Sequence, residues 1–430
     1  MTFLLAFVNL FIIGAVAHKM WRRQPIPAKF VFWPALLMKL GAGVCLGVIY
    51  MYYYQGIGDT VLYFEDSSRI SELARRGLMS YIEYLWRSNL ELGLVSDAAG
   101  QPRSIYLLKV ASVFNLLSQD NYWITATWFS FVSFVTSWYL VTQVARTVPS
   151  AYWPSVVGFL FFPTAVFWSS GLIKESLAMA GIYLLSGCFI RSWFSLRIRV
   201  WEMVAMPIAL WLVWSLKYYF LGALAPVAVA SLVVHKLYRR GFSGRGLPAK
   251  IFTWFVVMIV PLVVVSSLHP NFYPHVIMEV IVDNYKVFHE LSKPDDLIYY
   301  NNLQPTPGSL LVNSPKAIFS GLFRPLLWEG NSDLQVLAAI ENTLLLLLTI
   351  AAALNLPALW KSRFRLLIVT VIVYSLALAA FLALSTPNFG TLSRYKVGFL
   401  SFLVTVLLLQ NPLIIRVLRF LQRYRGNLAR

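Results

Sequence analysis

The sequence predicts an all-α polytopic membrane protein, and its composition, its hydrophobic runs and the placement of its charges support this fold class. The 430 residues are 59% hydrophobic, 16% aromatic and 13% charged, whereas soluble domains carry about 25% charged residues. Many apolar runs reach the roughly 20 residues that a helix needs to cross a bilayer. Strand-like alternation is absent, so helices rather than a barrel are expected to satisfy the backbone in lipid.

We expect about eleven transmembrane helices in one domain that covers residues 1–430. In chain order the expected spans are 2–18, 31–54, 122–144, 152–169, 173–190, 201–216, 218–235, 250–268, 335–356, 365–385 and 395–413. Basic residues follow the first span rather than precede it, so it is expected to be a retained helix and not a signal peptide. Cys45 and Cys188 both fall in apolar runs, which predicts neither a disulfide nor a metal cluster.

The positions of Lys and Arg set the predicted orientation. A net charge of +18 could indicate nucleic-acid binding, but the basic residues gather in short loops between apolar runs, as the positive-inside rule describes. These segments are 18–23, 191–199, 235–250, 361–365 and 416–430. The N-terminus is therefore expected outside and the C-terminus in the cytoplasm, with membrane lipids and no nucleic acid as partners. Of the 18 acidic residues, only Glu202 lies by the cytoplasmic face of this arrangement, which places the functional surface outside.

Two of the expected outer segments are long. The first, 55–121, has helical periodicity and is expected to hold amphipathic helices along the membrane surface. One of these would be capped by Asp66 or by a serine that follows it, and another would cover 104–119, for which a transmembrane pair is the alternative. The second segment, 269–334, is expected to shape an acceptor cleft. It contains three histidines without the regular spacing of a metal site.

The stretch GDTVLYFEDSSR, residues 58–69, places Asp59 directly after the second expected span and behind Gly56 and Gly58. Those glycines allow the backbone to turn tightly at the membrane surface. A partly desolvated carboxylate there is suited to act as a general base. Asp59 could also bind a hard cation such as Mg²⁺ or Mn²⁺. Glu65 and Asp66 are interpreted either as solvated loop and capping residues or as a second acid of the same site.

Charged residues at the outer edges of other spans are further candidates. Lys174 and Glu175 open the fifth expected span after the turn in FFPTAVFWSSGLIKES, where charges are costly and often functional. The alternative is an internal ion pair between these two residues. Lys217 lies between the sixth and seventh spans.

The late segments FRPLLWEGNSDLQ and STPNFGTLSRYKVGFLSFL add Arg324, Arg394 and Lys396 on the outer side, against the positive-inside trend. Such cations are suited to bind phosphate or pyrophosphate. The alternative is that their long side chains extend to the membrane interface.

Taken in order, GDTVLYFED, FFPTAVFWSSGLIKESLAM and GTLSRYKVGFLSFL resemble the GT-C class of integral-membrane glycosyltransferases, which use polyprenyl-phosphate sugars. In that class an acid follows a membrane helix on the first long outer loop, and surface helices come next. The chain departs from the pattern in two ways: an extra span precedes the loop, and Thr60 stands where a second acid is common.

The resemblance implies an inverting transferase in the cytoplasmic (inner) membrane, with its active site facing the periplasm or exterior. It would move a sugar from a polyprenyl-phosphate carrier to an envelope glycan or glycolipid acceptor. Asp59 would be the general base, and Arg394, assisted by Lys174 or Lys217, would neutralise the leaving phosphate. Glu175 would orient Lys174 or bind sugar hydroxyls, and Tyr63 would stack on a sugar face.

Other functions remain open from the sequence. Bacterial polysaccharide polymerases and ligases, which use polyprenyl-pyrophosphate-linked oligosaccharides, have a similar Gly-Asp-x-x-x-Tyr-like outer segment and many helices. A transporter of lipid-linked sugars is a further alternative, for which inverted repeats are typical. No repeat is evident, and Lys39 is the clearest charge within an expected span.

Overall fold

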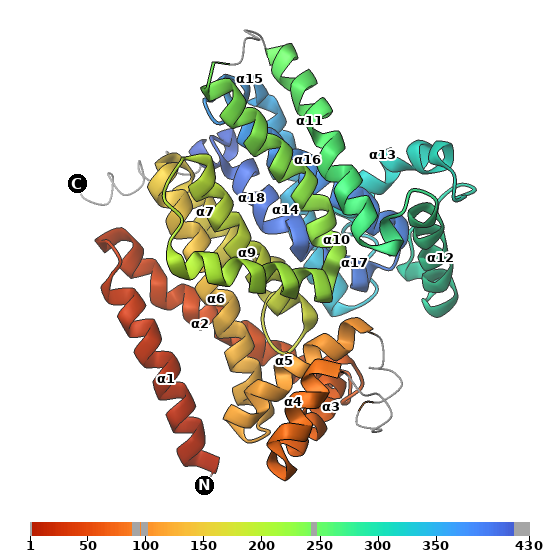
Figure 1. The fold of residues 1–430 in the computed structure, drawn as a ribbon. Coiled ribbons are helices and arrows are strands. Elements are labelled where there is room, and N and C mark those ends of the chain that lie inside the picture. The colour runs from red at the N-terminus through yellow and green to blue at the C-terminus, as the bar shows by residue number, and fades with distance from the viewer. Residues whose placement is uncertain (1, 88–94, 96–101, 242–246, 417–430) are drawn as a thin grey trace, which may run out of the picture. The chain divides into compact units, whose positions relative to one another are not determined.

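The structure is a computed structural model that describes residues 2–87, 95, 102–241 and 247–416 (Figure 1). Across these ranges the regular structure is helical, and the pairing of extended backbone is limited to an isolated bridge between Leu297 and Asn388. Within the same ranges seven helices are long and apolar enough to cross a membrane, or eight if a bent pair counts as one span. The prediction of a helical, membrane-embedded protein is therefore confirmed.

Among the described residues, ten α-helices precede residue 240, in the region of the expected spans from 2–18 to 218–235. They are α1 (Thr2–Arg22), α2 (Ile26–Val48), α3 (Asp59–Arg76), α4 (Leu78–Arg87), α5 (Pro102–Ser118), α6 (Tyr122–Thr147), α7 (Tyr152–Val156), α8 (Pro163–Phe167), α9 (Lys174–Trp193) and α10 (Val200–Arg239). The later helices are α11 (Leu247–Leu268), α12 (Val276–Leu291), α13 (Pro307–Phe323), α14 (Asp333–Leu354), α15 (Leu356–Lys361), α16 (Arg365–Ser385), α17 (Phe389–Tyr395) and α18 (Val397–Leu408).

The chain forms two compact units, each made of several stretches of sequence. The first unit contains Met1–Thr142, Ala165–Cys188 and Ile198–Leu221. The second contains Gln143–Thr164, Phe189–Arg197 and Gly222–Arg430. The expectation of a single transmembrane domain over 1–430 stays a prediction.

The predicted spans and the observed helices differ at particular places. The expected spans 201–216 and 218–235 lie in α10, which is interrupted only by the non-helical backbone of Lys217. The expected span 152–169 is broken into α7, a π-helical turn and α8. The expected span 395–413 corresponds to α18, which is bent by 64° from α17. Helix α9 covers residues 174–190 of the expected span 173–190 but is not among the seven candidate spans, so the count of eleven stays a prediction.

The predicted outer segment 55–121 contains α3, α4 and α5. Helix α3 packs against α5, and Asn115 of α5 joins the two by donating to the Oγ atoms of Ser67 and Ser68, at 2.8 and 3.2 Å. The prediction that Asp66 caps a helix was wrong, because α3 already begins at Asp59 and Asp66 lies in its middle. The sharp turn that ends at Gly58 starts the helix two turns earlier than the pattern of apolar residues indicated.

The predicted outer segment 269–334 also folds into helices, α12 and α13, both of which pack against α16 in the second unit. Gly321 allows the close approach of α13, because a Cβ atom at this position would overlap the carbonyl oxygen of Ala379 in α16. The backbone N–H of Ile298 donates to the carbonyl oxygen of Pro387 at 2.9 Å, beside the bridge from Leu297 to Asn388. This segment is thus attached to the loop that leads into α17.

Candidate functional site

The predicted base, Asp59, is the first residue of α3 and is half-buried. Helix α2 continues into a π-helical turn at Ile49–Tyr53, and the chain then reverses through Gly56 (φ +78°) and Gly58 (φ +143°). A Cβ atom on Gly58 would lie 2.5 Å from Cε1 of Tyr50, so the turn has no room for a side chain there. The predicted glycine turn is confirmed, and it places a carboxylate at the end of a candidate span.

The start of α3 is held in place by Thr60, the residue that follows Asp59. Thr60 is buried, and its hydroxyl is 2.8 Å from the hydroxyl of Tyr122 in α6. This contact gives a structural reason for the threonine that stands after Asp59 in place of a second acid. A threonine here anchors the helix start, and a carboxylate would be buried against a phenol.

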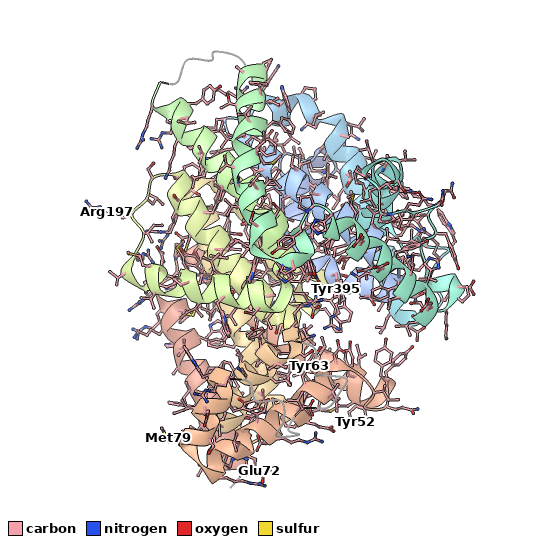
Figure 2. All side chains as sticks on the ribbon, turned by 45° about the vertical axis from the view of Figure 1, so that its right-hand side comes forward. Tyr52, Tyr63, Glu72, Met79, Arg197 and Tyr395 are labelled. Atoms are coloured by element: carbon pink, nitrogen blue, oxygen red, sulfur yellow. The ribbon has the colours of Figure 1, made fainter. Side chains whose placement is uncertain are left out.

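Lys174 and Tyr63, both predicted site residues, meet in the first unit. Tyr63 lies in α3 (Figure 2) and is buried. The ammonium of Lys174 lies 5.1 Å from the centre of the Tyr63 ring. This geometry is a cation–π contact. Tyr63 follows Asp59 by four residues on the same helix, and residues at that spacing are neighbours on one face. Asp59 and Tyr63 therefore share one face at the beginning of α3, and Lys174 contacts Tyr63 there.

Glu175 forms an ion pair with Lys217. The Lys217 Nζ lies 2.7 Å from the Glu175 Oε1, and the two side chains are only 4% and 0% exposed. Lys217 reaches this position from the interruption in α10, where its backbone leaves helical geometry (φ −147°, ψ 61°). This pair joins α9 to α10, and the alternative of an internal pair between Lys174 and Glu175 stays a prediction. Glu175 therefore orients Lys217.

Lys39 is a buried cation that the sequence marked only as a charge within a span. Its Nζ donates to the Oγ of Ser169, which lies in the turn before α9. The same turn is fixed by a hydrogen bond of 2.9 Å from the N–H of Gly171 to the Oγ of Ser130. Lys39 thus connects α2 to the loop that carries Lys174. A basic residue inside an apolar run was the available signal.

Asp66, predicted to bind substrate, is buried in the middle of α3. Its carboxylate accepts a hydrogen bond of 3.0 Å from Nη1 of Arg69, whose side chain is exposed. Burial and the nearby Asp66 carboxylate together raise the pKa of Tyr84 in α4. Asp66 therefore faces α4 and Arg69, and this geometry favours a role in packing the three short helices.

Arg324 and Glu329 form a bidentate pair at the end of α13 in the second unit. The Nη2 and Nε atoms of Arg324 lie 2.6 and 3.0 Å from the two carboxylate oxygens of Glu329. The guanidinium also stacks over the ring of Phe389, at 4.9 Å. Arg324 opposes the effect of burial, which raises the pKa of Tyr300. Arg324 thus closes the FRPLLWEG turn and remains partly exposed.

Lys396 lies at the bend between α17 and α18 and is buried. Its ammonium donates to the carbonyl oxygens of Leu322 and Arg324, at 3.2 and 2.7 Å, and to Oδ1 of Asn342, at 3.1 Å. An ammonium has three N–H donors, so each donor has a partner within the protein. These contacts favour a structural role for Lys396, and its binding of substrate phosphate stays a prediction.

Arg394 is half-buried in α17, two residues before Lys396. Arg324, Arg394 and Lys396 belong to the second unit, and Asp59 and Glu175 belong to the first. The participation of Arg394 in one site with Asp59 stays a prediction.

The histidines of 269–334 have local structural contacts. The Nδ1 of His269 accepts from the N–H of Asn271 at 3.1 Å, and the ring of His289 lies 4.4 Å from that of Tyr285. In the parts of the chain that the structure describes, no group of three or more His, Cys, Asp or Glu side chains is arranged to hold a metal ion.

Comparison of the chain with family models, curated proteins and solved structures found no match. The geometry of the candidate residues is therefore the basis for any functional proposal.

Proposed function

We propose that this protein is an inverting glycosyltransferase of the GT-C kind, which moves a sugar from a polyprenyl-phosphate carrier to a glycan or glycolipid acceptor. The observation that carries the proposal is the group formed by Asp59, Tyr63 and Lys174 at the end of a candidate membrane span. A carboxylate, an aromatic face and a cation match the acceptor hydroxyl, the sugar and the phosphate of such a reaction.

In the proposed reaction the acceptor oxygen attacks C1 of the donor sugar as the bond between C1 and the phosphate oxygen breaks. Asp59 takes the proton of the attacking hydroxyl, and the electron pair of the broken bond leaves with the polyprenyl phosphate. Lys174 contacts Tyr63, which follows Asp59 by one helical turn on α3, and it stabilises the charge that develops on this phosphate. The buried Glu175–Lys217 pair positions the start of α9 and thus the backbone that carries Lys174.

The topology belongs to the same proposal. We place the active site on the periplasmic or external face of the cytoplasmic membrane, with the N-terminus outside and the C-terminus in the cytoplasm. This orientation follows from the clustering of Lys and Arg in the predicted cytoplasmic loops. Eleven spans require that α9 crosses the membrane, that α10 counts as two spans on either side of Lys217, and that α7 with α8 and α17 with α18 each form one broken span.

The test is sugar transfer by the purified full chain in detergent, with labelled polyprenyl-phosphate sugars and envelope-lipid acceptors. Asp59→Asn is compared with Glu65→Gln, which removes a carboxylate from an exposed position of the same helix. We expect Asp59→Asn to lower kcat by about 10²-fold or more, whereas Glu65→Gln keeps its activity. A thermal melt confirms that both variants are folded.

Full activity of Asp59→Asn would remove Asp59 as the base. If wild-type protein transfers no single sugar but extends chains from pyrophosphate-linked oligosaccharides, the protein is a polysaccharide polymerase and the transferase proposal fails. Uptake of a lipid-linked sugar into vesicles without any transfer would instead support a transporter.

A further inference from the structure

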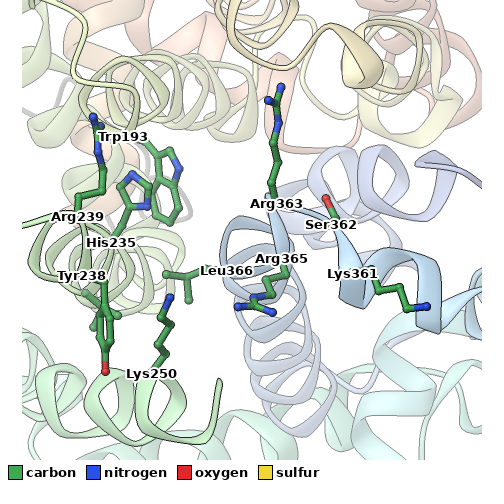
Figure 3. Close-up of a pocket in the computed structure, with 11 residues that line it drawn as sticks. Trp193, His235, Tyr238, Arg239, Lys250, Lys361, Ser362, Arg363, Arg365 and Leu366 are labelled. Carbon is green, nitrogen blue, oxygen red and sulfur yellow. The ribbon is translucent and has the colours of Figure 1, made fainter. Parts of the chain in front are cut away.

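The second unit contains a basic cavity that the proposed reaction does not use. Its volume is about 430 Å³, and its walls come from the ends of α9, α10, α11, α15 and α16 (Figure 3). Six of its lining side chains are basic, namely His235, Arg239, Lys250, Lys361, Arg363 and Arg365. None of the described residues that line it is acidic. Segments far apart in sequence thus place their basic groups around one hollow.

Aromatic contacts hold part of this lining in place. The ring of His235 stacks on that of Trp193, with centroids 4.1 Å apart and an angle of 18° between the rings. The ammonium of Lys250 lies 4.8 Å from the centre of the Tyr238 ring. Trp193 is buried and forms part of the inner wall of the cavity. The basic groups near this wall are therefore ordered before any ligand binds.

The charges of the cavity are not balanced by nearby acids. Across the described residues, none of the Arg and Lys side chains that line the cavity forms an ion pair with a carboxylate. Elsewhere in the same unit, Arg324 and Lys286 do have carboxylate partners. Like charges around a concave wall repel one another and concentrate a positive potential there. An anion in the cavity would relieve that repulsion.

A general excess of basic residues in cytoplasmic loops does not account for this arrangement. The positive-inside rule requires Lys and Arg near the ends of spans but does not require them to converge. Here two separate basic segments of the sequence, 235–250 and 361–365, bring their cations to one cavity, and the segment 191–199 contributes Trp193 to its wall. Lys250 and Arg365 are half-buried, so two of the cations face inward and are not freely solvated.

We propose that this cavity binds the phosphate group of an anionic ligand on the side of the membrane that carries the basic loops. Arg365 offers a planar guanidinium that can bind two phosphate oxygens, and Lys250 adds a point charge. Basic pockets between membrane helices bind phospholipid head groups by the same chemistry. The phosphate can belong to such a head group or to a soluble phosphate compound. This inference is independent of the proposed glycosyl transfer.

The test uses the purified full chain in a neutral detergent. Binding of phosphatidylglycerol, of phosphatidylcholine and of inorganic pyrophosphate is measured by titration for the wild type and for the double variant Lys250→Gln, Arg365→Gln. The matched control is Arg22→Gln, Arg23→Gln, which removes the same charge from an exposed basic segment outside the cavity. We expect phosphatidylglycerol to bind at least tenfold more tightly than phosphatidylcholine, and the double variant but not the control to lose this preference.

Competition separates the two sources of phosphate. If pyrophosphate displaces phosphatidylglycerol and binds alone with similar affinity, the ligand is a soluble phosphate compound; if it does neither, the ligand is a lipid. If the double variant does not fold, Arg239→Gln with Arg363→Gln, both at exposed positions, takes its place. The proposal is overturned if neither phosphate probe binds better than phosphatidylcholine, or if the control weakens binding as much as the cavity variant.

Discussion

Glu175 of α9 and Lys217 of α10 form a buried ion pair with an Nζ–Oε1 distance of 2.7 Å. The pair lies where α10 loses its helical backbone, because Lys217 departs from helical dihedral angles at this point. Both charges are almost fully removed from solvent, so each depends on the other for compensation. The pair therefore fixes how the first turn of α9, which carries Lys174, packs against the middle of α10.

Removing one member of this pair should destabilise the protein strongly. Glu175→Gln or Lys217→Met leaves a buried charge without its partner, which costs about 3–5 kcal/mol of unfolding free energy. The double variant removes both charges and should be less destabilised than the sum of the two single variants. Chemical denaturation in detergent, analysed as a double-mutant cycle, measures this coupling.

The exposed pair of Glu83 with Arg87 in α4 is the matched control. Their side chains are 62% and 72% exposed, and pairs of this kind contribute about 0.3–0.5 kcal/mol. Glu83→Gln should therefore change stability little. Additive effects at Glu175 and Lys217 would show that the two residues are not energetically coupled.

The local features of this region could be predicted from the sequence. The run of apolar residues before Gly56 indicated a span, and Gly58 indicated a sharp turn. Both features could be predicted because the residues that produce each of them are close together in the sequence. The partner of Glu175 could not be found in this way, since Lys217 is distant along the chain. The alternative of a pair with Lys174 conflicts with helix geometry, because adjacent residues on a helix do not face each other.

The roles of Lys396 and Asp66 could not be predicted for a different reason. A charged residue near a membrane span has the same appearance in sequence whether it faces a ligand or the protein interior. The two cases differ in how many hydrogen-bond donors of the side chain already have partners within the protein. For Lys396 these partners come from α13, α14 and the turn between them. Such contacts depend on tertiary packing, which cannot be predicted from the spacing of apolar residues along the sequence.

Lys396→Met should reduce stability and not donor affinity. It leaves two backbone carbonyl oxygens and the Oδ1 of Asn342 without their donor, and hydrogen bonds to charged groups contribute about 1.5–3 kcal/mol each. We expect a loss of at least about 3 kcal/mol in the free energy of unfolding. Lys293→Met, at an exposed position of the same unit, should have almost no effect. A stable Lys396→Met variant that no longer binds a phosphate donor would restore the role that the sequence suggested.

Tyr63 should contribute to donor binding through Lys174. Tyr63→Phe keeps the aromatic face beneath the ammonium, whereas Tyr63→Leu removes it. A cation–π contact contributes about 0.5–2 kcal/mol, so Tyr63→Leu should raise KM for a polyprenyl-phosphate sugar by up to about thirtyfold. Tyr63→Phe should remain close to wild type, and equal effects of both variants would point to the hydroxyl instead.

Gly58→Ala should disturb the turn that positions Asp59. The backbone of Gly58, at φ +143° and ψ 172°, lies in a region that only glycine populates readily, and an added Cβ atom would lie 2.5 Å from Tyr50 Cε1. The strain should cost about 1–3 kcal/mol, measured by chemical denaturation, and transfer activity should fall with it. Gly14→Ala is the control, because nothing lies within 4 Å of a Cβ atom at that helical position. It should be neutral or stabilise by up to about 1 kcal/mol. A Gly58→Ala variant as stable and active as wild type would show that the position of Asp59 does not depend on this turn.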